Sequence, residues 1–230
     1  MYHVGIDAHL RQSTYCVLDR DGKKLMSRTV RGPQRKLLKA LGEIKEPFEA
    51  CFEASCGYGH LYDELGKMAL RVQVAHPGAL RLIFRSRQKH DRMDAERLSK
   101  LLFLDEVPPV HVPSARVRTW RATISLRSKV VMRRTATKCR IRALLRSEGI
   151  EAPRSLWSKA GLKWLKDLAW SSDFSAVSRD LLVEELESVA GALRRLEKAL
   201  DGEARANPGV VLLRTIPGVG ARTAEAVVAY

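Results

Sequence analysis

The sequence predicts a mixed α/β domain followed by a region of long helices. In the first hundred residues, short apolar runs alternate with amphipathic helical segments, as in βαβα units. Pro108, Pro109 and Pro113 then interrupt the chain, because a helix interior does not accept proline. Beyond these prolines, the apolar residues recur mainly at helical spacing. We therefore expect one domain over 1–107, a basic helical and coiled-coil region over 114–206, and the start of a third domain over 207–230.

Three strands are predicted at the start of the chain. The runs YHVGIDA, STYCVLD and KLMSRTV are apolar and separated by short connections, one of which contains the turn dipeptide Asp21-Gly22. Consecutive strands joined by short turns pair as antiparallel neighbours. The first two runs should therefore form a hairpin.

Alternating helices and strands are predicted for the rest of the first domain. Residues 34–41 are helical in pattern, FEACFEAS is strand-like, and HLYDELGKMAL is an amphipathic helix that follows a glycine-rich break. RVQVAHP reads as a strand ended by Pro77, and residues 79–104 as mostly helical. This order extends the sheet with further strands, each followed by a helix.

The second half of the chain has helical patterns. Residues 114–147 predict one long helix, and PRSLWSKAGLKWLKDLAW a smaller one that is rich in tryptophan. A heptad seam follows, with apolar residues at spacings of four and three: Leu182, Leu186, Val189, Leu193, Leu196 and Leu200. This seam has two interpretations, packing on the basic helix within one chain or packing on a second subunit.

Positive charge is concentrated in the predicted long helix. The chain has 41 Lys and Arg against 26 Asp and Glu, a net charge of +15, and residues 115–150 hold eleven of the basic residues with Glu148 as their only acid. A face of one sign repels itself unless phosphates neutralise it, which favours nucleic-acid binding over a merely basic surface. Charge does not distinguish DNA from RNA. The candidate contacts are Arg116, Arg118, Arg121, Arg127, Lys129, Arg133, Arg134, Lys138, Arg140 and Arg142.

Membrane, secreted and zinc-binding classes are disfavoured. No apolar run approaches the roughly 18–20 residues of a membrane span, and the start of the chain lacks a secretory signal pattern, so we expect a cytoplasmic protein. The four cysteines form no CxxC pair. Cys51 and Cys56 are close enough in sequence to cross-link, but reduced thiols are expected in the cytosol.

Four acids form a candidate metal site. Asp7 and Glu53 stand near the ends of two predicted strands, and Asp91 and Asp94 share one helix face at i, i+3 spacing. Clustered carboxylates repel one another unless a hard cation such as Mg²⁺ (or Mn²⁺) lies between them, and such ions support phosphodiester chemistry. The alternative is structural: a turn residue at Asp7, an ion pair at Glu53, and partners for Asp91 and Asp94 among Arg87, Lys89 and Arg97.

Three segments resemble a known family. GIDAH at 5–9, FEAS at 52–55 with Gly57 following, and KHDRMDAERL at 89–98 resemble signature segments of the DEDD transposases of the insertion-sequence-110 family. The resemblance implies an RNase H-like fold similar to the RuvC Holliday-junction resolvase. It places the catalytic and metal-binding acids at Asp7, Glu53, Asp91 and Asp94.

The last residues extend this resemblance. The segment LLRTIPGVGARTAEAVVAY, 212–230, is similar to the opening of the family's C-terminal transposase domain. IPGVG before a helix is also a helix-hairpin-helix pattern, in which Gly218 and Gly220 let the backbone approach a phosphate; an ordinary turn is the alternative. In the family this domain continues and supplies a nucleophilic serine, which no serine here matches. We therefore expect that the chain is either a C-terminally truncated copy of such a transposase or a piece cut from a longer one.

The resemblance also implies partners and activity. It predicts a transposase or site-specific recombinase of an insertion sequence that binds DNA and a structured guide RNA, forms dimers or tetramers through its helical region, and is nucleoid-associated when acting. Two other functions stay open. One is a RuvC-like nuclease acting alone on branched DNA, and the other is an inert truncated transposase that only binds nucleic acid.

Overall fold

The computed structural model describes residues 1–55, 57–84 and 91–230, with the backbone alone at Asp91 and Arg92. Contacts between residues divide the chain into two compact units, Met1–Ser114 and Ala115–Tyr230. We refer to them as unit 1 and unit 2. No helix in the described part of the chain is long and apolar enough to cross a membrane.

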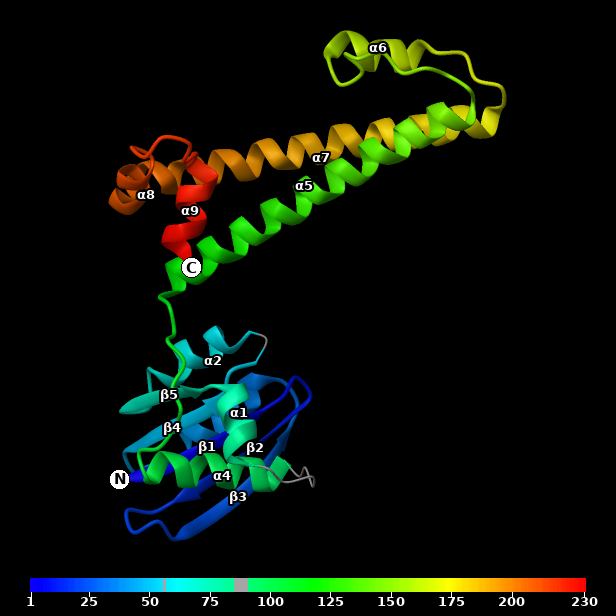
Figure 1. The fold of residues 1–230 in the computed structure, drawn as a ribbon. Helices are drawn as coiled ribbons and strands as arrows, with labels where there is room; N and C mark the ends of the chain where they lie inside the picture. The colour runs from blue at the N-terminus through cyan, green and yellow to red at the C-terminus, as the bar shows by residue number, and fades with distance from the viewer. Residues whose placement is uncertain (56, 85–90) are drawn as a thin grey trace. The chain divides into compact units, whose positions relative to one another are not determined.

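Unit 1 is built on a five-stranded mixed sheet (Figure 1). The strand order is β3-β2-β1-β4-β5, in which β1 pairs antiparallel with β2 and parallel with β4. The predicted hairpin of the first two strands is therefore confirmed. The strands are β1 (Tyr2–Ala8), β2 (Gln12–Leu18), β3 (Lys24–Arg31), β4 (Phe48–Glu53) and β5 (Arg71–Ala75).

In the described part of unit 1, four helices accompany this sheet. They are α1 (Gln34–Gly42), α2 (Tyr58–Leu65), α3 (Pro77–Ile83) and α4 (Asp91–Phe103). The segment predicted as mostly helical over 79–104 thus contains two helices, and residues 85–90 lie outside the described residues. Helix α2 ends earlier than the predicted 60–70, at Leu65, where Gly66 stands at its C-cap.

The two faces of the sheet have separate cores. Alternate residues of a strand point to opposite faces, so Val4 and Ile6 pack with Leu37 and Leu61 of α1 and α2. On the other face, Cys51 packs with the leucines of α4. Helix α4 lies across this second face (Figure 1). Unit 1 is therefore a sheet between two helical layers, and the predicted mixed α/β class is confirmed.

Unit 2 is helical, with α5 (Ala115–Ser147), α6 (Lys159–Asp167), α7 (Asp173–Ala206), α8 (Pro208–Leu213) and α9 (Ala221–Ala229). Helices α5 and α7 run side by side in opposite directions (Figure 1). Leu186, Val189, Leu193 and Leu200 of the predicted seam are buried, and α7 packs on α5 of the same chain. Packing within one chain, the first interpretation of the seam, is thus present, and packing on a second subunit stays a prediction.

Candidate active site and basic helix

Two of the four predicted acids stand at the same edge of the sheet. Strands β1 and β4 are parallel neighbours with Ile6 opposite Phe52, so Asp7 and Glu53 follow at adjacent positions. Parallel strands bring their carboxyl ends to one edge, which is where functional groups gather in α/β sheets. Asp7 is the penultimate residue of β1, and Glu53 is the last residue of β4.

Helix α4 reaches this edge because Gly5 has no side chain. A Cβ atom built on Gly5 would lie 2.2 Å from the carbonyl oxygen of Ala95 and 2.2 Å from the amide nitrogen of Ser99. Both of these α4 residues are fully buried. The backbones of β1 and α4 are therefore in direct contact two residues before Asp7 and one residue after Asp94. The glycine at position 5 thus determines which part of α4 faces the strand ends.

Three predicted acids line one cavity. Asp7, Glu53 and Asp94 border a cavity of about 390 Å³ at this edge of unit 1. Its wall also contains side chains of other chemistry, namely His9, Ser55, Pro77, Leu80, Arg81, Phe84, Arg97 and Leu98. The fourth predicted acid, Asp91, is the first residue of α4, and its side chain lies outside the described atoms. Residues far apart in sequence, from two strands and one helix, thus share this cavity.

Two of these acids have basic partners in the cavity wall. The Nε2 atom of His9 lies 3.1 Å from the carboxylate of Asp7. Arg97 donates a hydrogen bond from Nη1 to the Asp94 carboxylate at 3.3 Å. The structural alternative for Asp94, an ion pair with Arg97, is therefore present. His9 was not recognised from the sequence as a site residue, although its place two residues after Asp7 was a usable signal.

The donor chemistry of the cavity fits a hard divalent ion. Asp7, Glu53 and Asp94 supply carboxylate oxygens, which are the protein ligands that Mg²⁺ and Mn²⁺ prefer. Among the described residues, however, no three His, Cys, Asp or Glu side chains form a ready metal-binding group. Asp7 and Asp94 instead face His9 and Arg97. Binding an ion would therefore require the carboxylates to move closer together, and Asp7 and Asp94 to exchange His9 and Arg97 for the ion.

Four of the predicted nucleic-acid contacts on α5 have glutamate partners on α7. Arg116 pairs with Glu203 at 3.0 Å and Arg127 with Glu197 at 2.8 Å. Arg133 and Arg140 both pair with Glu185, at 2.8 and 3.6 Å. The positive charge of α5 is therefore partly neutralised within the chain, which the sequence of α5 alone could not reveal.

Other basic residues of α5 contact aromatic rings or face solvent. Lys138 and Arg142 lie over the ring of Trp157, at 4.7 and 5.5 Å from its centroid. Burial, followed by the nearby charges of Arg134 and Arg142, lowers the pKa of Lys138. Lys129 is exposed. The predicted basic surface is thus divided into side chains held by the protein and side chains open to a ligand.

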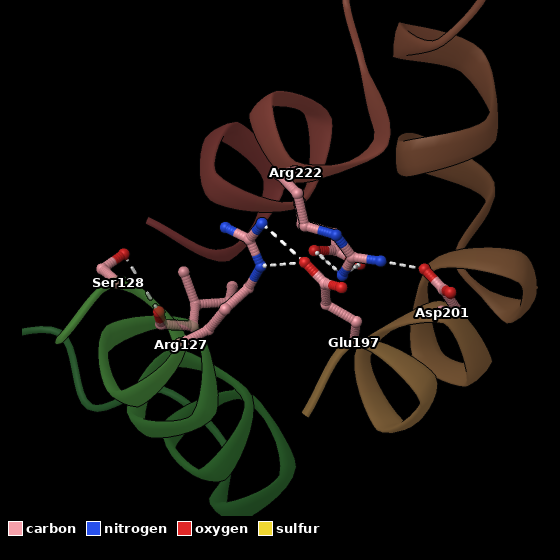
Figure 2. A network of polar contacts seen from close by, with 7 residues as sticks. Arg127, Ser128, Glu197, Asp201 and Arg222 are labelled. Atoms are coloured by element: carbon pink, nitrogen blue, oxygen red, sulfur yellow. Dashed lines mark hydrogen bonds and ion pairs between the residues drawn. The ribbon is translucent and has the colours of Figure 1, made fainter. Parts of the chain in front are cut away.

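Polar contacts hold α9 against the long helices (Figure 2). Arg222 of α9 forms ion pairs with Asp201 of α7 and with Glu225, one turn further along α9. Glu225 is almost completely buried, and this burial raises the pKa of its carboxyl. The glycine-containing turn before α9 is open: Gly218 has a φ of +85°, and a Cβ at Gly218 or Gly220 would meet no atom within 4 Å.

Comparison with known proteins decides the family. Residues 4–149, more than half of the chain, match the family model for DEDD transposases of the IS110 group, described as "Transposase". The chain belongs to this family. The matched region contains unit 1 from residue 4 onward and all of α5. The mixed sheet of unit 1 is consistent with an RNase H-like transposase domain.

Two curated relatives of this chain carry the name of transposase or probable transposase. A probable family 20 transposase of Pseudomonas aeruginosa is 25% identical over 182 residues, covering 76% of the chain and 53% of the relative. The transposase for insertion sequence element IS1111A of Coxiella burnetii is 26% identical over 231 residues, covering 98% of the chain and 62% of the relative. The chain thus spans between about half and three fifths of the length of these relatives.

Proposed function

We propose that this chain acts in DNA transposition as the metal-dependent transposase of an insertion sequence. The observation that carries the proposal is the shared cavity of Asp7, Glu53 and Asp94 at the edge of the sheet. The RNase H-like character of the sheet and membership of the family support the same function. The substrate would be a phosphodiester bond brought to this cavity.

The carboxylates would hold Mg²⁺ or Mn²⁺, with Asp91 completing the set from the first turn of α4. Such an ion, when bound, polarises a phosphoryl oxygen and stabilises the charge of the attacking and leaving oxygens. The chain's own contribution is the placement of the ligands. Gly5 fixes α4 against β1, and the parallel pairing of β1 and β4 sets Asp7 beside Glu53.

Nucleic acid would contact the chain outside the cavity as well. The exposed basic side chains of α5 suit a phosphate backbone, whether in DNA or in a structured guide RNA. The open turn at Gly218 and Gly220, followed by the N-terminus of α9, suits a helix-hairpin-helix contact with phosphate. A dimer or tetramer formed through the helical unit is part of the same proposal.

Thermal unfolding with Mg²⁺ tests the metal site. A ligand present at ten times its Kd stabilises the folded state by about 1.4 kcal/mol, so the melting temperature of unit 1 should rise by roughly 5 °C. The combined substitutions Asp91→Ala and Asp94→Ala should abolish this rise. Asp21→Ala, which removes an exposed acid of unit 1, should leave it unchanged.

Two results would count against the proposal. An equal Mg²⁺ response in the double variant would place the bound ion elsewhere. A chain that binds nucleic acid but shows no Mg²⁺ response in any variant would instead support the third function considered above, a transposase-derived chain that binds without catalysis.

A further inference from the structure

Arg97 lines the cavity, and the metal site does not explain its presence there. Its guanidinium lies 5.1 Å from the centroid of the Phe84 ring, and the side chain is 22% exposed. Both residues line the cavity together with the three acids. Stacking on an aromatic face restricts a guanidinium without using its N–H groups. The contact with Phe84 therefore holds Arg97 beside the acids and does not depend on the acids themselves.

The contact between Arg97 and Asp94 competes with a cation. Nη1 of Arg97 donates to Oδ1 of Asp94, which is one of the oxygens a divalent ion would use. A guanidinium beside a metal ion also repels it, because two positive charges a few ångströms apart interact strongly at a partly buried site. Without a third group, Arg97 would therefore weaken metal binding by the acids.

A phosphate resolves this conflict. The hydrogen bond to Asp94 uses one N–H of a group that has five, and the planar fork of arginine matches two oxygens of a phosphate. When an ion takes Asp94, the guanidinium loses its carboxylate but keeps the Phe84 ring. Its donors then face a cavity in which a phosphate would lie between it and the ion.

We infer that Arg97 is the phosphate-binding residue of the cavity, and that it exchanges Asp94 for a nucleic-acid phosphate when a divalent ion binds. This inference rests on the proposed function. The ion and the nucleic acid then bind cooperatively. The phosphate neutralises the guanidinium that repels the ion, and the ion takes Asp94 and so releases the guanidinium for the phosphate. Metal loading without nucleic acid is correspondingly disfavoured.

Mn²⁺ titrations with and without a short DNA duplex test the inference. In the unsubstituted chain, the duplex should tighten Mn²⁺ binding about tenfold, within the usual range of coupling between sites. In Arg97→Met, Mn²⁺ alone should bind about threefold or more tighter, since the competing guanidinium is gone. The duplex should then add less than about twofold. The duplex also binds Mn²⁺ through its own phosphates, so the difference between the unsubstituted chain and Arg97→Met is the quantity specific to the cavity.

Two further variants separate local chemistry from charge and folding. Lys100→Met removes a positive charge that pairs with Glu96 on the same helix but does not line the cavity, so its titrations should match those of the unsubstituted chain. Arg97→Lys keeps the charge without the planar fork, and its coupling should be intermediate. Melting curves without ligand establish that each variant is folded.

The outcomes distinguish this inference from the proposed function. Undiminished coupling in Arg97→Met, with normal Mn²⁺ binding by the unsubstituted chain, would overturn the role of Arg97 and leave the metal site intact. If Lys100→Met lost the coupling to the same extent, the coupling would depend on net charge alone, and the role of Arg97 would also be overturned. Failure of every variant to bind Mn²⁺ would overturn the proposed function and this inference with it.

Discussion

Gly5 controls the geometry of the candidate site although it carries no functional group. Helix α4 touches the backbone of β1 at this residue, so that Asp94 comes to the edge of the sheet where Asp7 and Glu53 lie. A motif such as GIDAH therefore combines two roles. The aspartate supplies the carboxylate, and the glycine admits the helix that supplies the next one.

Replacing Gly5 by alanine should destabilise unit 1 and disturb the site. The new Cβ would lie 2.2 Å from backbone atoms of α4, which cannot move aside without shifting the helix. We expect a loss of about 2–3 kcal/mol in the free energy of unfolding, measured by urea denaturation. Gly42→Ala is the matched control, since its Cβ would meet no atom within 4 Å. Equal stability of the two variants would contradict the role given to Gly5.

The pairing of α5 with α7 changes how the basic helix is understood. Its sequence shows a face of one sign, whereas the structure places Glu185, Glu197 and Glu203 of α7 beside four of its arginines. The prediction of a basic face on α5 did not include these glutamates, because they lie about fifty to ninety residues further along the chain. Exposed arginines in such pairs can still bind phosphate, so their role in nucleic-acid binding stays a prediction.

Single substitutions on α5 should separate structural from binding charges. Lys129→Ala removes an exposed charge, so we expect weaker DNA binding, a slope of log K against log salt lowered by about 1, and an unchanged melting temperature.

Arg127→Ala removes the ion pair with Glu197, so we expect a loss of about 1 kcal/mol in unfolding free energy. Filter binding and thermal unfolding measure the two effects. The reverse pattern would contradict this division of roles.

At the scale of the whole molecule, the sequence predicted what local patterns encode. Alternating apolar runs and turn residues revealed the hairpin of β1 and β2, and the strand-end positions of Asp7 and Glu53 pointed to a shared edge. The contact of Arg97 with the Phe84 ring depends on how the end of α3 packs against α4. Such a tertiary contact has no signature in the spacing of residues, whereas the ion pair of Arg97 with Asp94 is local to α4, and Arg97 was a candidate partner from its position one turn after Asp94.

We propose that acids from two strands and one helix of unit 1 bind the same divalent ion. Anomalous diffraction from crystals soaked in Mn²⁺ tests it most directly, because the manganese signal locates the ion independently of any model of the site. We predict a peak about 2.2 Å from oxygens of Asp7, Glu53 and Asp94. A peak at other residues, or carboxylates that still face His9 and Arg97 in saturating Mn²⁺, would contradict the account.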